Sequence, residues 1–220
     1  MIVQNILGEE KLQKQNIRKV NMAKINNTLY LTDDYIFLKN KKKNIFIKSN
    51  INKGIVECNR IYNIDKFIKC YEKILRENKL NNNLIGDTIK IIVSPNYYPS
   101  DIFVLKNIFE KFNYRKVIVE NEIKTYKLNN NNCYLNIFDN YMFLTYIDEY
   151  QKIKSYVINN NYYLDIEFLI KSIKNKIKDK DILIFGHGKL LQEIFSKFED
   201  LYNNKTYLYS NFDTFIIDNN

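Results

Sequence analysis

The hydrophobic positions of this chain follow two periods, one typical of short strands and one typical of amphipathic helices. Alternating or continuous apolar runs predict strands over 28–32, 35–38, 44–48, 89–94, 116–119, 133–138, 141–147, 152–158, 181–185, 205–209 and 212–217. Apolar residues spaced three and four apart predict helices over 65–79 and 100–112, from Asp165 onward and after Gly188. Strands that alternate with helices in this way predict a mixed α/β protein.

The order of these elements already suggests some of their connections. Residues 89–119 form one β-α-β unit, whose two strands should be parallel neighbours joined by a right-handed crossover. The three strands between 133 and 158 instead imply two hairpins. Residues 1–24 are polar with loosely spaced apolar positions, which favours a short helix or an arm. A membrane-touching amphipathic helix is the alternative for that segment.

The charge of the chain is positive but dispersed. Its 34 Lys and Arg residues stand against 25 Asp and Glu, a formal net charge of +9 that would favour nucleic acid or lipid head groups as partners. The densest clusters are 39–43, which Asn40 interrupts, and 171–180, which Ile173 and Ile177 interrupt, and the abundant Asn, Lys, Ile, Tyr and Phe are residues that AT-rich codons encode. We therefore interpret the lysines first as solvated surface and second as an anion-binding surface.

The cysteines and the single histidine limit the available chemistry. Cys58, Cys70 and Cys133 are odd in number and widely spaced, which matches neither paired zinc ligands nor a secreted disulfide framework. His187 is the only histidine, so the chain alone cannot supply a histidine-based metal cluster or a serine-histidine triad. No apolar run approaches the roughly 20 residues needed to span a bilayer, and no basic leader is followed by an apolar core. We expect a cytoplasmic protein without a metal site, with peripheral contact at the inner membrane as an alternative.

Three stretches share their order and spacing with segments of a known family. The first is Lys53-Gly-Ile-Val-Glu-Cys-Asn-Arg-Ile-Tyr-Asn-Ile-Asp65, a turn that leads to a helix. The second runs from Ile91-Ile-Val-Ser-Pro-Asn96 through a helix to Val117-Ile-Val-Glu-Asn-Glu122. The third is Ile182-Leu-Ile-Phe-Gly-His-Gly-Lys-Leu-Leu191, a hydrophobic strand, a glycine turn and a Leu-Leu helix start. Together they resemble the bacterial actin-like ATPases of the MreB-like, rod-shape-determining branch.

This resemblance implies an actin-like (ribonuclease H-like) α/β fold, a mixed sheet with flanking helices. We expect one sheet to contain the strands near 28–38, 89–94, 116–119 and 133–147, and a second, smaller layer to come from 182–217. The chain would divide into an N-terminal arm or short helix at 1–24, a first actin-like subdomain at 25–160 and a remnant of the second at 161–220. Family members insert a small subdomain where this chain has little more than one helix, between Ile158 and Asp181, so we expect that subdomain to be missing.

The resemblance also implies a nucleotide site. In the family two β-hairpins, each with an Asp and glycines, clasp the phosphates, and a glycine turn lies against the adenosine. The matching positions are the candidate cofactor-binding residues Asp33, Asp34, Asp139, Gly186, His187 and Gly188. Neither hairpin of this chain has a glycine, and bulky Phe138 and Tyr141 occupy the second one. Glu122 is nearest to the family's water-positioning glutamate and is the one catalytic candidate, although without a phosphate clasp we expect it to be structural.

The leading hypothesis is a non-catalytic actin-fold protein, without a cofactor, that serves as an interaction or scaffold module related to the bacterial cell-shape cytoskeleton. Its interface would include Phe138, Tyr141 and Phe185 on a face that the missing subdomain leaves bare. A cleft closed on itself, with these residues in the core, is the alternative.

Two other hypotheses use different chemistry. A weak cytoskeletal ATPase would bind ATP and magnesium, and a basic nucleic-acid-binding protein would use Lys41, Lys42 and Lys43 as phosphate contacts. Among partners we rank a protein or a second copy of the chain first, an anionic membrane surface next and nucleic acid last.

Overall fold

The computed structural model describes residues 25–57, 59–80, 86–94, 97–126, 128–138, 141–159, 165–186, 190–201 and 206–209. The arm expected at 1–24 and the strand expected at 212–217 lie outside these ranges. Within them no helix is long and apolar enough to cross a membrane.

The first half of the chain builds a five-stranded sheet in the order β3-β2-β1-β6-β7. Its strands are β1 (Ile25–Leu31), β2 (Tyr35–Asn40), β3 (Ile45–Asn50), β6 (Thr88–Val93) and β7 (Lys116–Asn121). A small ribbon of β4 (Val56–Glu57) and β5 (Arg60–Ile61) precedes helix α1 (Ile64–Glu77), and α2 (Pro99–Glu110) connects β6 to β7. Strands β6 and β7 are parallel neighbours, which confirms the β-α-β unit expected over 89–119.

The second half repeats this arrangement. After a 3-10 turn (Glu122–Thr125), a second five-stranded sheet has the order β10-β9-β8-β11-β12. Its strands are β8 (Asn132–Ile137), β9 (Tyr141–Ile147), β10 (Ile153–Asn159), β11 (Asp181–Gly186) and β12 (Thr206–Tyr209), and its helices are α3 (Ile166–Ile177) and α4 (Leu191–Leu201). In each half an antiparallel meander of three strands is followed by two parallel strands.

The placement of residues 133–147 in the first sheet is wrong. Strand β8 pairs in parallel with β11, with Cys133 opposite Ile182, so the meander of β8, β9 and β10 belongs to the second sheet. Hydrophobic periodicity finds a strand but does not determine its neighbour, which is why the sequence did not separate the two sheets. A division at residue 160 would cut this second sheet, and we propose that the boundary between the halves lies between β7 and β8.

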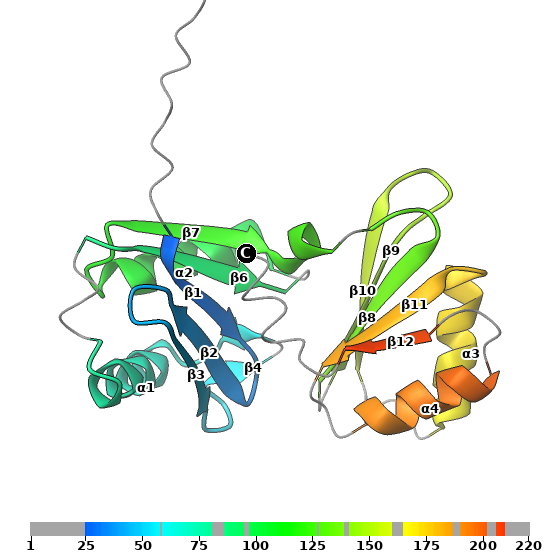
Figure 1. Ribbon diagram of the computed structural model, residues 1–220, viewed down its shortest axis with the longest axis horizontal. Coiled ribbons are helices and arrows are strands. Elements are labelled where there is room, and N and C mark those ends of the chain that lie inside the picture. Colours follow the sequence, from blue (N-terminus) through cyan, green and yellow to red (C-terminus); the bar gives the residue numbers. More distant parts are fainter. Residues whose placement is uncertain are drawn as a thin grey trace, which may run out of the picture.

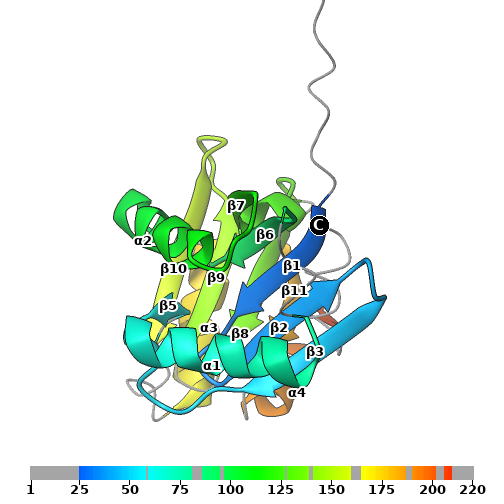
Figure 2. The ribbon, with the colours of Figure 1, turned by 90° about the vertical axis from the view of Figure 1, so that its left-hand side faces the viewer.

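Four layers follow along the long axis of the molecule (Figure 1). Helices α1 and α2 cover the outer face of the first sheet, and they lie in front of it when the molecule is viewed from that side (Figure 2). Helices α3 and α4 cover the outer face of the second sheet. The inner faces of the two sheets meet in a third apolar cluster, which is mostly aromatic.

The chain between the last strand of the second meander and β11 is short. Helix α3 is the one element described between Asn159 and Asp181. The fold is therefore the expected mixed α/β architecture without an inserted small subdomain at this point.

Candidate functional site

The two hairpins that the resemblance assigns to phosphate binding contact each other. One is formed by β1 and β2 in the first half, and the other by β8 and β9 in the second half. Asp33 lies in the turn between β1 and β2, and its carboxylate accepts a hydrogen bond from the Tyr141 hydroxyl at 3.2 Å. Tyr141 is the first residue of β9 and is buried. The same carboxylate accepts the backbone N–H of Asn59 at 2.9 Å, and the Tyr141 hydroxyl also hydrogen-bonds the Asn59 side chain. The two candidate phosphate hairpins are therefore joined directly by protein side chains.

Asn59 connects this contact to the loops around it. It is buried between β4 and β5, and its φ of 62° is in the left-handed region that Asn tolerates better than most residues. Its carbonyl accepts a hydrogen bond from the Tyr97 hydroxyl. Nearby, Arg60 pairs with Asp101 at 3.2 Å and lies over the Tyr98 ring at 4.6 Å. The loop before α2 is thus tied to the same point as the two hairpins.

Glu122 begins the 3-10 turn that connects the two halves, and its side chain lies between the two sheets. Its side chain is fully buried, and it accepts hydrogen bonds from the Tyr126 hydroxyl at 2.8 Å and from the Asn136 amide at 3.5 Å. Burial raises the pKa of Glu122 to about 7, although hydrogen bonds from Tyr126, Tyr30 and Asn136 oppose the shift. Asn136 also reaches Tyr30 across the sheets, at 3.4 Å. The carboxyl group is enclosed by polar side chains from both halves.

We expect the pH dependence of stability to change in Glu122→Gln. Because the folded pKa lies above the ordinary value of 4.5, the stability due to the protonated form is complete below about pH 4.5 and is lost as pH rises through about 7. The difference amounts to on the order of 3 kcal/mol. Urea unfolding at about pH 4.5 and about pH 8 should show this loss in the natural protein and a much smaller loss in Glu122→Gln. Equal pH dependence in both proteins would contradict the buried, protonated carboxyl.

Gly186 has a structural reason to be glycine. It ends β11 with a φ of 128°, and a Cβ atom added there would lie 1.9 Å from the Ile137 carbonyl oxygen. The close approach of β11 to β8 therefore accounts for a glycine at position 186 without a nucleotide.

Asp34, the other acidic residue of the first hairpin, has a structural contact through its backbone. Its carbonyl accepts the N–H of Ile51 at 2.7 Å, which fixes the first hairpin to the end of β3.

Three of the candidate cofactor-binding residues, Asp139, His187 and Gly188, lie outside the described residues. Within the described ranges no group of three or more His, Cys, Asp or Glu side chains is placed to hold a metal ion.

The expectation of an exposed interface at Phe138, Tyr141 and Phe185 is wrong. These side chains are 3%, 1% and 0% exposed and belong to the inter-sheet cluster. Tyr134 stacks on Phe185 with ring centroids 5.4 Å apart, and Phe138 contacts Tyr141 at 4.9 Å. The first sheet covers this face through Tyr30, Phe37 and Ile92, so the absence of a small subdomain does not leave it bare.

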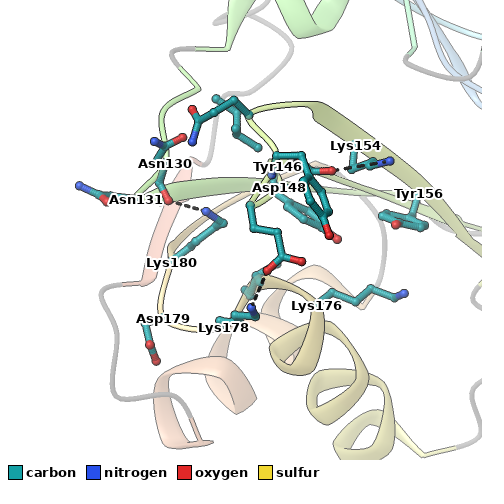
Figure 3. Close-up of a pocket in the computed structure, with 15 residues that line it drawn as sticks. Asn130, Asn131, Tyr146, Asp148, Lys154, Tyr156, Lys176, Lys178, Asp179 and Lys180 are labelled. Carbon is teal, nitrogen blue, oxygen red and sulfur yellow. Dashed lines mark hydrogen bonds and ion pairs between the residues drawn. The ribbon is translucent and has the colours of Figure 1, made fainter.

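A cavity of about 470 Å³ lies away from the hairpins, between the β9–β10 turn and the end of α3 (Figure 3). Its lysines already have partners. Lys154 pairs with Asp148 at 3.7 Å, Lys178 pairs with Glu149 at 3.4 Å and Lys180 donates to the Asn130 carbonyl. Acidic and basic groups nearly balance in its walls, which gives no preference for an anion.

The lysines of the nucleic-acid hypothesis are also partly engaged. Lys42 pairs with buried Asp87, and the Lys43 ammonium group donates to the Lys79 carbonyl. These contacts fix the turn between β2 and β3 against the end of α1 and reduce the charge available to a phosphate backbone.

Several residues of the site were not found from the sequence. Asn59, Tyr97, Tyr30, Tyr126 and Asn136 form its hydrogen bonds, but each comes from a different segment of the chain. The one signal available was a polar residue at an inner position of an apolar strand, as with Asn136 in β8. A buried polar side chain needs a partner, so Asn136 could have been marked as part of a network.

Comparisons with known proteins support the fold. No family model and no curated protein matches the chain. Among solved structures, MreB5 of Spiroplasma citri bound to AMPPNP is 12% identical, with 89% of this chain and 95% of that chain covered and a TM-score of 0.62. The ethanolamine utilization protein EutJ from Carboxydothermus hydrogenoformans is 9% identical, with 88% of each chain covered and a TM-score of 0.61. A MamK double helical filament is 10% identical, with 87% and 97% covered and a TM-score of 0.52. The chain has an actin-like ATPase fold.

Proposed function

We propose that this protein is a non-catalytic actin-fold protein that serves as an interaction or scaffold module related to the bacterial cell-shape cytoskeleton. The observation that carries the proposal is the contact between Tyr141 and Asp33, which joins the two hairpins where the resemblance implies a phosphate clasp. Self-association is the interaction mode we favour, because a structural neighbour of this fold, MamK, forms a double helical filament.

The physical reason for expecting no catalysis is geometric. Phosphoryl transfer depends almost entirely on positioning and on charge neutralisation around the phosphates. Here the carboxylate of Asp33 already accepts hydrogen bonds from the Tyr141 hydroxyl and from the backbone N–H of Asn59, whose buried side chain also bonds Tyr141. Glu122 is enclosed by Tyr30, Tyr126 and Asn136, so it does not face a position that a water molecule and a phosphate could share.

The second candidate is an ATP-binding protein. It is favoured by the likeness to MreB5, whose structure contains AMPPNP, and by the carboxylate of Asp33 at the first hairpin. In that case ATP would have to separate Tyr141 from Asp33 when it binds.

Nucleotide binding and hydrolysis separate the two candidates. We expect ATP with magnesium to leave the thermal unfolding temperature unchanged, because a ligand raises it only when it binds the folded state. We also expect hydrolysis no faster than in a buffer control. A magnesium-dependent rise in unfolding temperature that disappears in Asp33→Asn, or turnover that disappears in Glu122→Gln, would favour the ATP-binding candidate instead.

A further inference from the structure

The outer edge of β10 has no strand partner in the part of the chain that the structure describes. The strand order places β10 at the margin of the second sheet, and within the described ranges no strand pairs with its outer side (Figure 1). Residues 153–157 are all exposed, including Ile153 at 54% and Val157 at 49%. An open edge with exposed β-branched residues is a template for another strand, and proteins usually protect such edges with several charges or a proline. In β10 the one charged residue is Lys154, and there is no proline.

The direction of the backbone groups follows from the turn before β10. The N–H of Asp148 donates to the carbonyl of Lys152 at 2.9 Å, so the backbone groups of residue 152 point toward β9. Because these directions alternate along an antiparallel ladder, those of Lys154 and Tyr156 also point toward β9. The N–H and C=O groups of Ile153, Ser155 and Val157 therefore point toward the open edge.

The side chains of β10 are held in defined positions. Tyr156 lies on the α3 side of the sheet, where its ring stacks on Tyr146 at 6.0 Å and the Lys176 ammonium group lies 4.5 Å from its centroid (Figure 3). Ser155, on the other face, hydrogen-bonds Thr145 at 3.0 Å. The middle of the strand is thus fixed on both faces, while no described strand pairs with its outer edge.

We infer that β10 pairs antiparallel with β10 of a second copy of this chain, which deepens the proposed function by naming its self-association surface. Full overlap of the seven residues places Tyr156 opposite the partner's Tyr156, and Ser155 opposite the partner's Val157. In this register the outward backbone groups of Ser155 and Val157 face one another, as an antiparallel ladder requires.

The charges are compatible with the same register. Lys154 lies opposite the partner's Ile158, so no like charges face each other, whereas a register centred on Lys154 would oppose two ammonium groups. The pairing joins two five-stranded sheets into one continuous sheet. A single strand pair is smaller than a standard interface of about 1,600 Å², so the dimer should be weak and depend on concentration.

Cross-linking tests the register. Tyr156→Cys, in a chain that also carries Cys58→Ser and Cys70→Ser, should form a disulfide-linked dimer on mild oxidation. The two Cβ atoms of a directly opposed pair lie about 4.5–5.5 Å apart, near the range that a disulfide needs. Ser155→Cys in the same background is the matched control, since it faces the partner's Val157 and lies about 7–8 Å from the partner's Ser155. Equal cross-linking of both variants would overturn the register.

Val157→Pro tests the edge itself. Proline removes an N–H that points to the open edge and leaves the ladder with β9 intact, so the variant should remain folded and become monomeric in analytical ultracentrifugation. Val157→Thr keeps the N–H and the branched shape and should still dimerise. A natural protein that is monomeric at every concentration, or a dimer that Val157→Pro does not change, would overturn the inference. The second result would leave assembly through another surface, and the nucleotide test of the proposed function is independent of both.

Discussion

Tyr141→Glu is expected to destabilise the protein by about 3 to 5 kcal/mol. The side chain is 1% exposed and packed among Phe138 and Phe143, so the variant would bury a carboxylate beside the carboxylate of Asp33. Urea unfolding monitored by circular dichroism measures the change.

Two further variants separate the loss of the hydroxyl group from the effect of the new charge. Tyr141→Phe removes only the hydroxyl and should cost about 1 kcal/mol. Phe103→Glu places the same new charge on a residue that is 66% exposed, and it should change stability by no more than about 0.5 kcal/mol. If Tyr141→Glu left stability unchanged but abolished self-association, Tyr141 would be an interface residue after all.

Gly186→Ala is expected to cost about 3 to 5 kcal/mol. Its φ of 128° is unfavourable for any residue with a Cβ atom, and that atom would overlap the Ile137 carbonyl oxygen. Strand β11 would have to move away from β8, which would loosen the apolar packing on both faces of the second sheet.

The matched control is Gly54→Ala. Gly54 also has a positive φ, 76°, but an added Cβ would meet nothing within 4 Å, so we expect a loss of only about 1 kcal/mol. Thermal unfolding of both variants compares the cost of the positive φ alone, at Gly54, with the cost of a positive φ plus the overlap with Ile137, at Gly186. Equal losses would mean that the contact with Ile137 adds nothing to the backbone strain.

The sequence predicted most elements of the fold because local patterns determine them. The strand 89–94 became β6, and the helix expected from Asp65 became α1, which Asn63 caps by accepting the N–H of Lys66. The parallel pairing of β6 and β7 followed from the β-α-β rule. What the sequence did not contain was a local signal for the partner of β8, since Cys133 and Ile182 lie far apart along the chain.

The site was harder to predict for the same reason. Asp33 was found from the resemblance, but its hydrogen-bond partners, Asn59 and Tyr141, come from distant segments. The sequence left two alternatives for Tyr141, an exposed face or a closed cleft, because an aromatic residue at the start of a strand fits either. Its burial between the sheets decides for the closed cleft in the described part of the chain.

The inter-sheet cluster also sets the order in which a new chain can fold. Tyr30 meets Asn136 across a separation of 106 residues, and Tyr141 meets Asp33 across 108. During synthesis the first half therefore leaves the ribosome with Tyr30 and Phe37 uncovered until β8, β9 and β11 follow. Contacts of such long range slow folding and prolong the exposure of apolar surface. An unfinished chain should therefore be prone to aggregation until these three strands have been made.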